Sequence, residues 1–229
     1  SNGMIEPLVG TQLAGVIWYQ GESNSGNPVQ YRQLLPALIA DWRQRFANPD
    51  LHFGIVQLAN FLPRVSDPVQ EGWAGLREAQ ALTAQADAHA SLAVAIDIGE
   101  ADDIHPKNKY DVGHRLALGA LAKHYHLDIP AQGPAFQRLT IEQNSVRLYF
   151  NTAAGLKTTD GMAPQGFALS GPDGAWQHAQ AAIDGETVVL RAEGISAPRA
   201  VRYAWANNPA VNLVNGADLP AIPFRSDGP

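Results

Sequence analysis

An aspartate and a histidine three residues apart form the segment best suited to proton transfer. Residues 102–106 read Asp-Asp-Ile-His-Pro and come directly before a helical pattern. A carboxylate that accepts a hydrogen bond from one ring nitrogen leaves the other nitrogen free to take a proton from a hydroxyl nucleophile. We therefore expect His105 to be a general base and Asp102 its orienting acid. The alternative is that Asp102 or Asp103 only caps the helix, for which Pro106 would suit the first position.

A second group of polar residues follows the first apolar run. Residues 18–24 read Trp-Tyr-Gln-Gly-Glu-Ser-Asn. The Gln20 or Asn24 amide could donate to a developing oxyanion, which contributes about 3 kcal/mol to transition-state stabilisation, and Gly21 permits close backbone approach. Ser23 is a possible nucleophile, but the last glycine of a Gly-x-Ser-x-Gly elbow is missing. The alternative is a polar turn that caps the next helix.

The composition describes an ordinary globular protein. Of 229 residues, 45% are hydrophobic and 17% are charged, which predicts a sizeable core. The net charge of −6 argues against a nucleic-acid partner, and no apolar run reaches the roughly 20 residues that span a bilayer. Without cysteine there is no disulfide and no thiolate site. Since the remaining histidines lack carboxylates in a ligand pattern, we expect no metal and no cofactor.

Strands and helices alternate in the first half of the chain. Apolar runs predict buried strands, and apolar residues at helical spacing predict amphipathic helices. The expected strands are 13–19, 51–58 and 91–98, and the expected helices are 31–46, 75–88 and 107–125, with a long loop at 60–72. This order predicts a parallel sheet. Both polar segments then follow the carboxyl ends of strands, where ligands bind in such sheets.

The pattern changes after residue 129. Pro130, Gly133 and Pro134 mark a boundary, and short alternating runs separated by Asp-Gly turns follow. Antiparallel strands are expected at 139–141, 146–150, 166–170, 187–192 and 200–204. We therefore expect an α/β domain over residues 1–129 and a smaller β-rich domain over residues 130–229.

Several segments together resemble the sialate O-acetylesterase family of SGNH-type carbohydrate esterases. These segments are residues 18–24, 77–80, 102–106, 201–205, 219–221 and 223–225. The resemblance covers essentially the whole chain. It implies a three-layer SGNH-hydrolase-like fold with a parallel sheet, and a serine esterase that removes acetyl groups from glycans.

The resemblance also implies roles for single residues. His105 becomes the general base and Asp102 its orienting acid, while the Gln20-Gly21 region forms the oxyanion hole, with Gln20 as the side-chain donor. Because their charges are opposite, Glu22 and Arg77 are expected to form a supporting ion pair behind this loop. The alternative is that these are two unrelated charges.

One element of the family pattern is missing. In this family the nucleophilic serine lies in a Gly-Gln-Ser-Asn-Met type motif upstream of the segment at 18–24, and the chain contains no such motif. We therefore expect residues 1–129 to be the C-terminal portion of an incomplete SGNH domain. The serine would lie on an upstream segment or a companion chain, and the expected location is secreted or periplasmic.

Two other functions remain open from the sequence. Ser23 could act as the nucleophile of a chain that works alone. A non-catalytic carbohydrate-binding or structural fragment is the other alternative, because Trp176, Tyr203 and Trp205 could offer an aromatic platform to a sugar. These aromatic residues could instead pack in the core.

Overall fold

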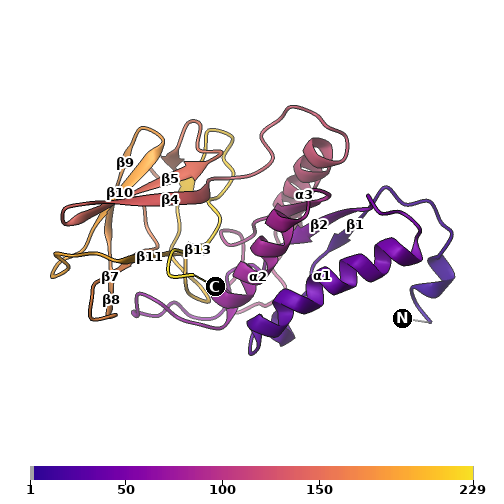
Figure 1. Ribbon diagram of the computed structural model, residues 1–229, viewed down its shortest axis with the longest axis horizontal. Coiled ribbons are helices and arrows are strands. Elements are labelled where there is room, and N and C mark those ends of the chain that lie inside the picture. Colours follow the sequence, from indigo (N-terminus) through magenta and orange to yellow (C-terminus); the bar gives the residue numbers. More distant parts are fainter. Residues whose placement is uncertain (1–2, 229) are drawn as a thin grey trace.

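The chain folds into an α/β part and an antiparallel β part, which lie next to each other (Figure 1). This computed structural model describes residues 3–228. Ser1 and Asn2, at the start of the expected α/β domain, and Pro229, at the end of the β-rich domain, lie outside the described residues.

Three parallel strands form the sheet of the α/β part, in the order β1-β2-β3. Their bounds are Gly15–Trp18 for β1, His52–Val56 for β2 and Ala90–Ala93 for β3. Because all three strands run in the same direction, their carboxyl ends share one rim. The parallel sheet expected from the alternating strand and helix pattern is confirmed.

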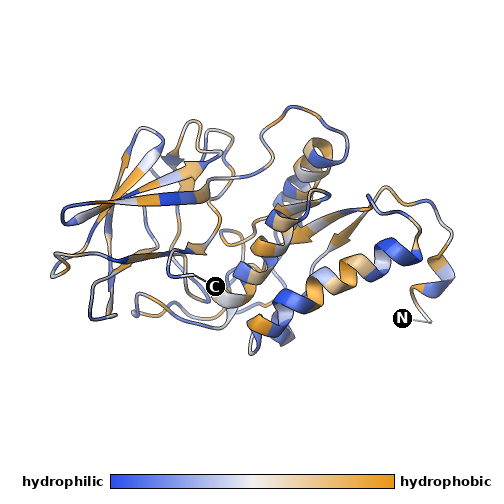
Figure 2. Cartoon of the chain, in the orientation of Figure 1, coloured by the Kyte–Doolittle hydropathy of each residue, from blue (hydrophilic) through white to orange (hydrophobic). Residues whose placement is uncertain are grey.

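Helices cover both faces of this sheet. They are α1 (Pro28–Arg45), α2 (Trp73–Ala86) and α3 (Lys109–Lys123), and two short 3-10 helices span Glu6–Leu8 and Glu22–Asn24. Phe53 and Ile55 of β2 share a core with α1 and α2, whereas Val56 packs with Leu116 of α3 on the other face. Hydrophobic and hydrophilic residues alternate along α1 and α3, as expected of helices with one buried face (Figure 2). No helix within residues 3–228 is long and apolar enough to cross a membrane.

The start of α3 differs from the prediction. The Asn108 side chain accepts a 3.1 Å hydrogen bond from the backbone N–H of Asp111 and so caps a helix that begins at Lys109. Pro106 is buried in the preceding bend and does not occupy the first helical position. An asparagine is a strong N-cap residue, and the helix begins three residues later than Pro106 suggested.

The β part contains two four-stranded antiparallel sheets. Their strand orders are β4-β5-β10-β9 and β13-β11-β7-β8, and β6 pairs with β12. The bounds are Ala135–Glu142 (β4), Ser145–Asn151 (β5), Lys157–Thr158 (β6), Phe167–Ser170 (β7), Trp176–His178 (β8), Gln180–Asp184 (β9), Thr187–Arg191 (β10), Ala200–Tyr203 (β11), Leu213–Val214 (β12) and Phe224–Arg225 (β13). All five expected strands are present. β6, β8, β9, β12 and β13 were not predicted.

Candidate active site

The two polar loops that the sequence singled out both lie at the carboxyl rim of the sheet, where they follow the outer strands β1 and β3. Lys109, four residues after His105, has its Nζ 5.4 Å from the centre of the Tyr19 ring. Tyr19 directly precedes Gln20 in the first loop. Burial, reinforced by the nearby Glu22 carboxylate, raises the pKa of the Tyr19 hydroxyl, so this ring is neutral at physiological pH.

The Gln20 side chain is fixed by residues on both sides. Its Oε1 lies 3.0 Å from the hydroxyl of Tyr31, a buried residue of α1. Its Nε2 donates to Asn24 Oδ1 at 2.9 Å. One hydrogen of Gln20 Nε2 and the Asn24 Nδ2 group have no partner in the described part of the chain. These groups can therefore donate to a bound oxygen.

Gly21 occupies a backbone conformation that suits glycine alone. Its φ is +148°, and a Cβ at this position would lie 2.5 Å from Leu76 Cδ2. Its N–H donates to Oε2 of Glu22 at 2.9 Å. The Glu22 carboxylate therefore occupies the Gly21 donor, whereas the side-chain amides of the loop remain available.

Two side-chain amides, of the buried Gln80 and the half-buried Asn60, hold the loops of this rim together. Gln80 of α2 accepts from the backbone N–H of Leu58 at 3.0 Å and donates to the carbonyl of Gln20 at 3.1 Å. Asn60 accepts from the backbone N–H of Gly99 at 2.6 Å. These bonds connect the three loops that follow β1, β2 and β3.

Arg77 does not form the expected ion pair with Glu22. It is fully buried, and its guanidinium donates to four backbone carbonyls at 2.7 to 2.8 Å. These carbonyls belong to Leu58 and Ala59, in the loop that follows β2, and to Ala206 and Asn207 in the β part. Burial lowers the Arg77 pKa to about 9, so the side chain remains charged at pH 7. Arg77 therefore joins the two parts of the molecule.

His105 and Asp102 are both exposed in the bend before α3. No hydrogen bond joins their side chains within residues 3–228. Asp103 instead accepts a 2.8 Å bond from the backbone N–H of His105. The structure thus brings the two candidate residues into one loop and leaves the imidazole open to a bound molecule.

Two ion pairs hold this loop. Lys107 contacts Glu100 at 3.0 Å through its Nζ and at 3.0 Å through its backbone N–H. The two bonds to Lys107 lower the pKa of the Glu100 carboxyl. Below the loop, Arg115 of α3 forms a bidentate pair with Asp97 at 2.6 and 2.7 Å. The loop between these pairs is therefore anchored at both ends.

No serine in the described part of the chain forms a triad with a histidine at this rim. Ser23 is exposed and has no hydrogen bond to a histidine. A serine and histidine do meet at the opposite end of the sheet, where Ser91 Oγ lies 3.1 Å from His52 Nε2. Both residues are buried, and His52 Nδ1 has no hydrogen-bond partner in the part of the chain that the structure describes. Because that histidine has no carboxylate to orient it, the pair lacks a triad's third member.

The proposed aromatic platform is absent. Tyr203 and Trp205 are 1% and 2% exposed, and they pack in the core. Trp176 is partly covered by the Arg202 guanidinium, 4.6 Å from its ring. Among residues 3–228 there is also no group of three or more side chains suited to hold a metal ion.

The sequence did not indicate the residues that position the rim. Asn60, Gln80, Glu100, Asp97 and Arg115 act through backbone groups or through partners in other elements. Gln80 belongs to the Arg-Glu-Ala-Gln run at 77–80, which is one of the segments that carry the family resemblance. Its place in that run was the one available signal.

Known proteins are similar to this chain in sequence. A family model described as "Carbohydrate esterase, sialic acid-specific acetylesterase" matches residues 4–122, slightly more than half of the chain. Sialate O-acetylesterase of Rattus norvegicus is 30% identical over 251 residues, which cover 98% of this chain and 46% of the rat protein. The Homo sapiens sialate O-acetylesterase is 34% identical over 158 residues, covering 61% and 30% of the two chains.

A solved structure gives the same result. The crystal structure of a carbohydrate acetylesterase from Xanthomonas citri is 42% identical, has a TM-score of 0.92, and is matched over 98% of this chain and 52% of that chain. This chain spans about half the length of the rat relative and of the Xanthomonas protein. The family match confirms the resemblance found in the sequence. This chain belongs to the family of carbohydrate esterases described as sialic acid-specific acetylesterases.

Proposed function

We propose that this chain supplies the acid–base and oxyanion part of a serine carbohydrate O-acetylesterase. The observation that carries the proposal is the contact between Lys109 and Tyr19, because it joins the start of α3, which follows the His105 loop, to the residue that precedes Gln20. General base and oxyanion donors must lie around one reacting carbonyl. Membership in the acetylesterase family supports an acetylated carbohydrate as the substrate.

In the proposed reaction, a serine hydroxyl attacks the acetyl carbonyl and His105 takes the hydroxyl proton. The side-chain amides of Gln20 and Asn24 donate to the oxyanion. Collapse of the tetrahedral intermediate breaks the ester bond, and His105 gives its proton to the departing sugar oxygen. Water then attacks the acetyl-enzyme with His105 as base, which releases acetate and restores the serine. Asp102 orients the imidazole once the two side chains turn towards each other.

We further propose that the serine belongs to polypeptide outside these 229 residues, in an upstream segment or a companion chain. Two observations support this. Among residues 3–228, Ser23 has no histidine partner, and β1 is the edge strand of the described sheet, with Ile17 73% exposed. A further strand would cover that edge. Residues 1–129 would then be the C-terminal portion of the catalytic domain, and residues 130–229 a separate β-rich domain.

Labelling of the native enzyme with a fluorophosphonate, followed by peptide mass spectrometry, tests both proposals. The label is expected on a serine outside these residues. His105→Ala is expected to slow labelling and acetate release by about 100-fold or more. His114→Ala, which changes an exposed histidine of α3, is the matched control. It is expected to be labelled and to release acetate at the rates of the unaltered enzyme. Label on Ser23, or normal acetate release by His105→Ala, would contradict the assignment.

A further inference from the structure

A cavity between the two parts of the molecule lies away from the rim that carries His105. Its volume is about 360 Å³, within the range of roughly 300–1,000 Å³ of small-molecule sites, which often occur between domains. It is lined by Ala90, Ser91 and Leu92 in β3 and by Lys123, the last residue of α3. The His105 loop follows β3 and precedes α3, so it leaves the opposite ends of both elements.

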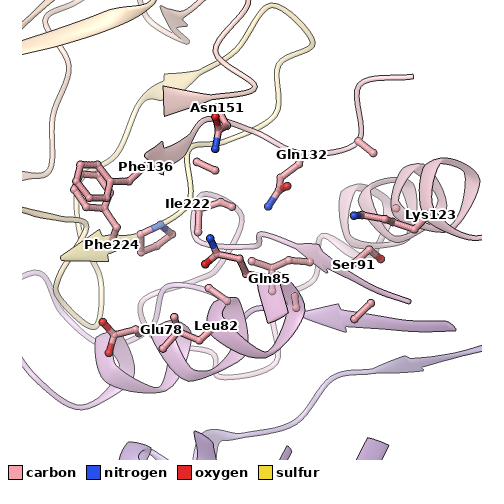
Figure 3. Close-up of a pocket in the computed structure, with 18 of the residues that line it drawn as sticks. Glu78, Leu82, Gln85, Ser91, Lys123, Gln132, Phe136, Asn151, Ile222 and Phe224 are labelled. Atoms are coloured by element: carbon pink, nitrogen blue, oxygen red, sulfur yellow. The ribbon is translucent and has the colours of Figure 1, made fainter. Parts of the chain in front are cut away.

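Four polar side chains surround this cavity without a partner. They are Gln85 of α2, Lys123 of α3, Asn151 of β5 and Gln132, which lies before β4. Their side-chain amide and ammonium groups form no hydrogen bond within residues 3–228. All four residues are exposed, so a solute can reach them. In Figure 3 the Gln85 and Gln132 amides point into the same space between α2 and the strands of the β part.

The floor of the cavity is apolar. Ala81 and Ala84 of α2, Leu92 of β3, Phe136 of β4 and Ile222 provide it. A pyranose ring combines apolar C–H faces with hydroxyl groups along its edge. Each amide at the mouth can both donate and accept, as a hydroxyl does. The cavity therefore matches a single sugar ring better than it matches a wholly apolar ligand.

The charges around the cavity favour an anion. The Glu78 carboxylate is already compensated, because Arg225 binds it at 2.8 and 3.1 Å and Arg32 binds it from α1. The Lys123 ammonium has no ion-pair partner in the described part of the chain. One uncompensated positive charge therefore remains at the mouth, where a carboxylate of the ligand would contact it.

We propose that this cavity is a second saccharide site, which binds the ring of an acidic sugar. Lys123 binds the sugar carboxylate, Gln85, Gln132 and Asn151 bind its hydroxyls, and the apolar floor contacts its C–H face. The site holds a sugar without acting on it, since His105 lies at the other end of the sheet. The inference rests on the cavity itself and does not depend on the esterase proposal.

Titration of the protein with glucuronate and glucose, followed by amide NMR, tests the proposal because the two sugars differ by the carboxylate alone. Saturable shifts are expected at residues lining the cavity, with glucuronate bound about fivefold more tightly, as for a partly exposed ion pair. Lys123→Ala is expected to remove this preference for glucuronate. Gln132→Ala is expected to weaken the binding of both sugars. Lys109→Ala, at the other end of α3, is the matched control and is expected to keep the preference.

Two results would overturn the second site. One is the absence of saturable shifts around the cavity with either sugar. The other is an unchanged preference for glucuronate in Lys123→Ala. His105→Ala is expected to bind glucuronate normally, so failure of the esterase proposal would leave this result intact.

Discussion

The Asn60 side chain fastens the loop that carries His105. Its Oδ1 accepts a 2.6 Å bond from the backbone N–H of Gly99, and its Nδ2 donates to Asn208 at 2.9 Å. A Cβ at position 99 would lie 2.1 Å from the Asn60 carbonyl oxygen. The two loops can approach this closely only because residue 99 is glycine. One amide therefore ties the loops after β2 and β3 to the β part.

Replacing this amide is expected to loosen the His105 loop. Asn60→Ala leaves the Gly99 N–H without its partner, which costs about 1–3 kcal/mol locally. We expect faster hydrogen exchange at residues 99–107 and a roughly tenfold lower kcat for acetyl ester hydrolysis, with little change in KM. Asn60→Asp keeps an acceptor for Gly99 and is expected to recover part of the loss. Equal exchange rates in Asn60→Ala and the unaltered enzyme would refute the role.

Removing the Arg77 guanidinium is expected to destabilise the whole molecule. Arg77→Met leaves the carbonyls of Leu58, Ala59 and Ala206 without a donor, while the Asn207 carbonyl keeps the Phe61 N–H. We therefore expect the free energy of unfolding to fall by about 3 kcal/mol or more in urea titrations. Arg77→Lys keeps the charge but lacks the planar fork, and is expected to be intermediate. Arg191→Met is the control, since this arginine is exposed and is expected to change stability by less than about 0.5 kcal/mol. Equal losses at the two positions would contradict the role of Arg77.

The sequence predicted the location of the carboxyl rim better than it predicted the hydrogen bonds that position the loops there. Apolar runs located the parallel strands, and parallel strands place the Gln20 and His105 loops on one edge. Arg77 was assigned to Glu22 because charge complementarity is visible in a sequence. Its actual partners are backbone carbonyls, which carry no sequence signal. The same reason hid the contributions of Asn60 and Gln80.

The β part shows a different limit of sequence prediction. The alternation of apolar and polar residues identified β5 and β10. These strands have seven and five residues, enough for several side chains to face the core. The two-residue strands β6, β12 and β13 offer no alternation to detect. Their pairing depends on contacts with strands far away in the chain, such as Val214 with Lys157. Only the folded structure reveals them.

The buried His52 is expected to make stability depend on pH. Burial, with a smaller effect of nearby His124, lowers the His52 pKa to about 4, whereas an unfolded histidine titrates near 6.5. The unfolded chain then binds more protons between these values. The free energy of unfolding is therefore expected to fall as pH drops from about 6.5 to about 4, by at most about 3 kcal/mol.

Urea unfolding at pH 4, 5, 6 and 7 measures this dependence. His52→Gln keeps a polar group near Ser91 but cannot titrate, so its stability is expected to vary less over this range. His114→Gln, at an exposed position of α3, is expected to keep the slope of the unaltered protein. The same slope in His52→Gln would show that other groups cause the pH dependence.

The backbone at Gly21 is expected to control both the Gln20 loop and the packing of α2. In Gly21→Ala the new methyl group would lie 2.5 Å from the buried Leu76 side chain, at a φ of +148°. Strain and overpacking of this kind cost about 1–3 kcal/mol each. We expect lower stability and a displaced loop, so that kcat falls because the Gln20 and Asn24 amides no longer face the oxyanion. Gly26→Ala is the matched control, because nothing lies within 4 Å of a Cβ there. If both variants unfold at the same urea concentration and hydrolyse acetyl esters equally fast, the Gly21 conformation has no part in forming the site.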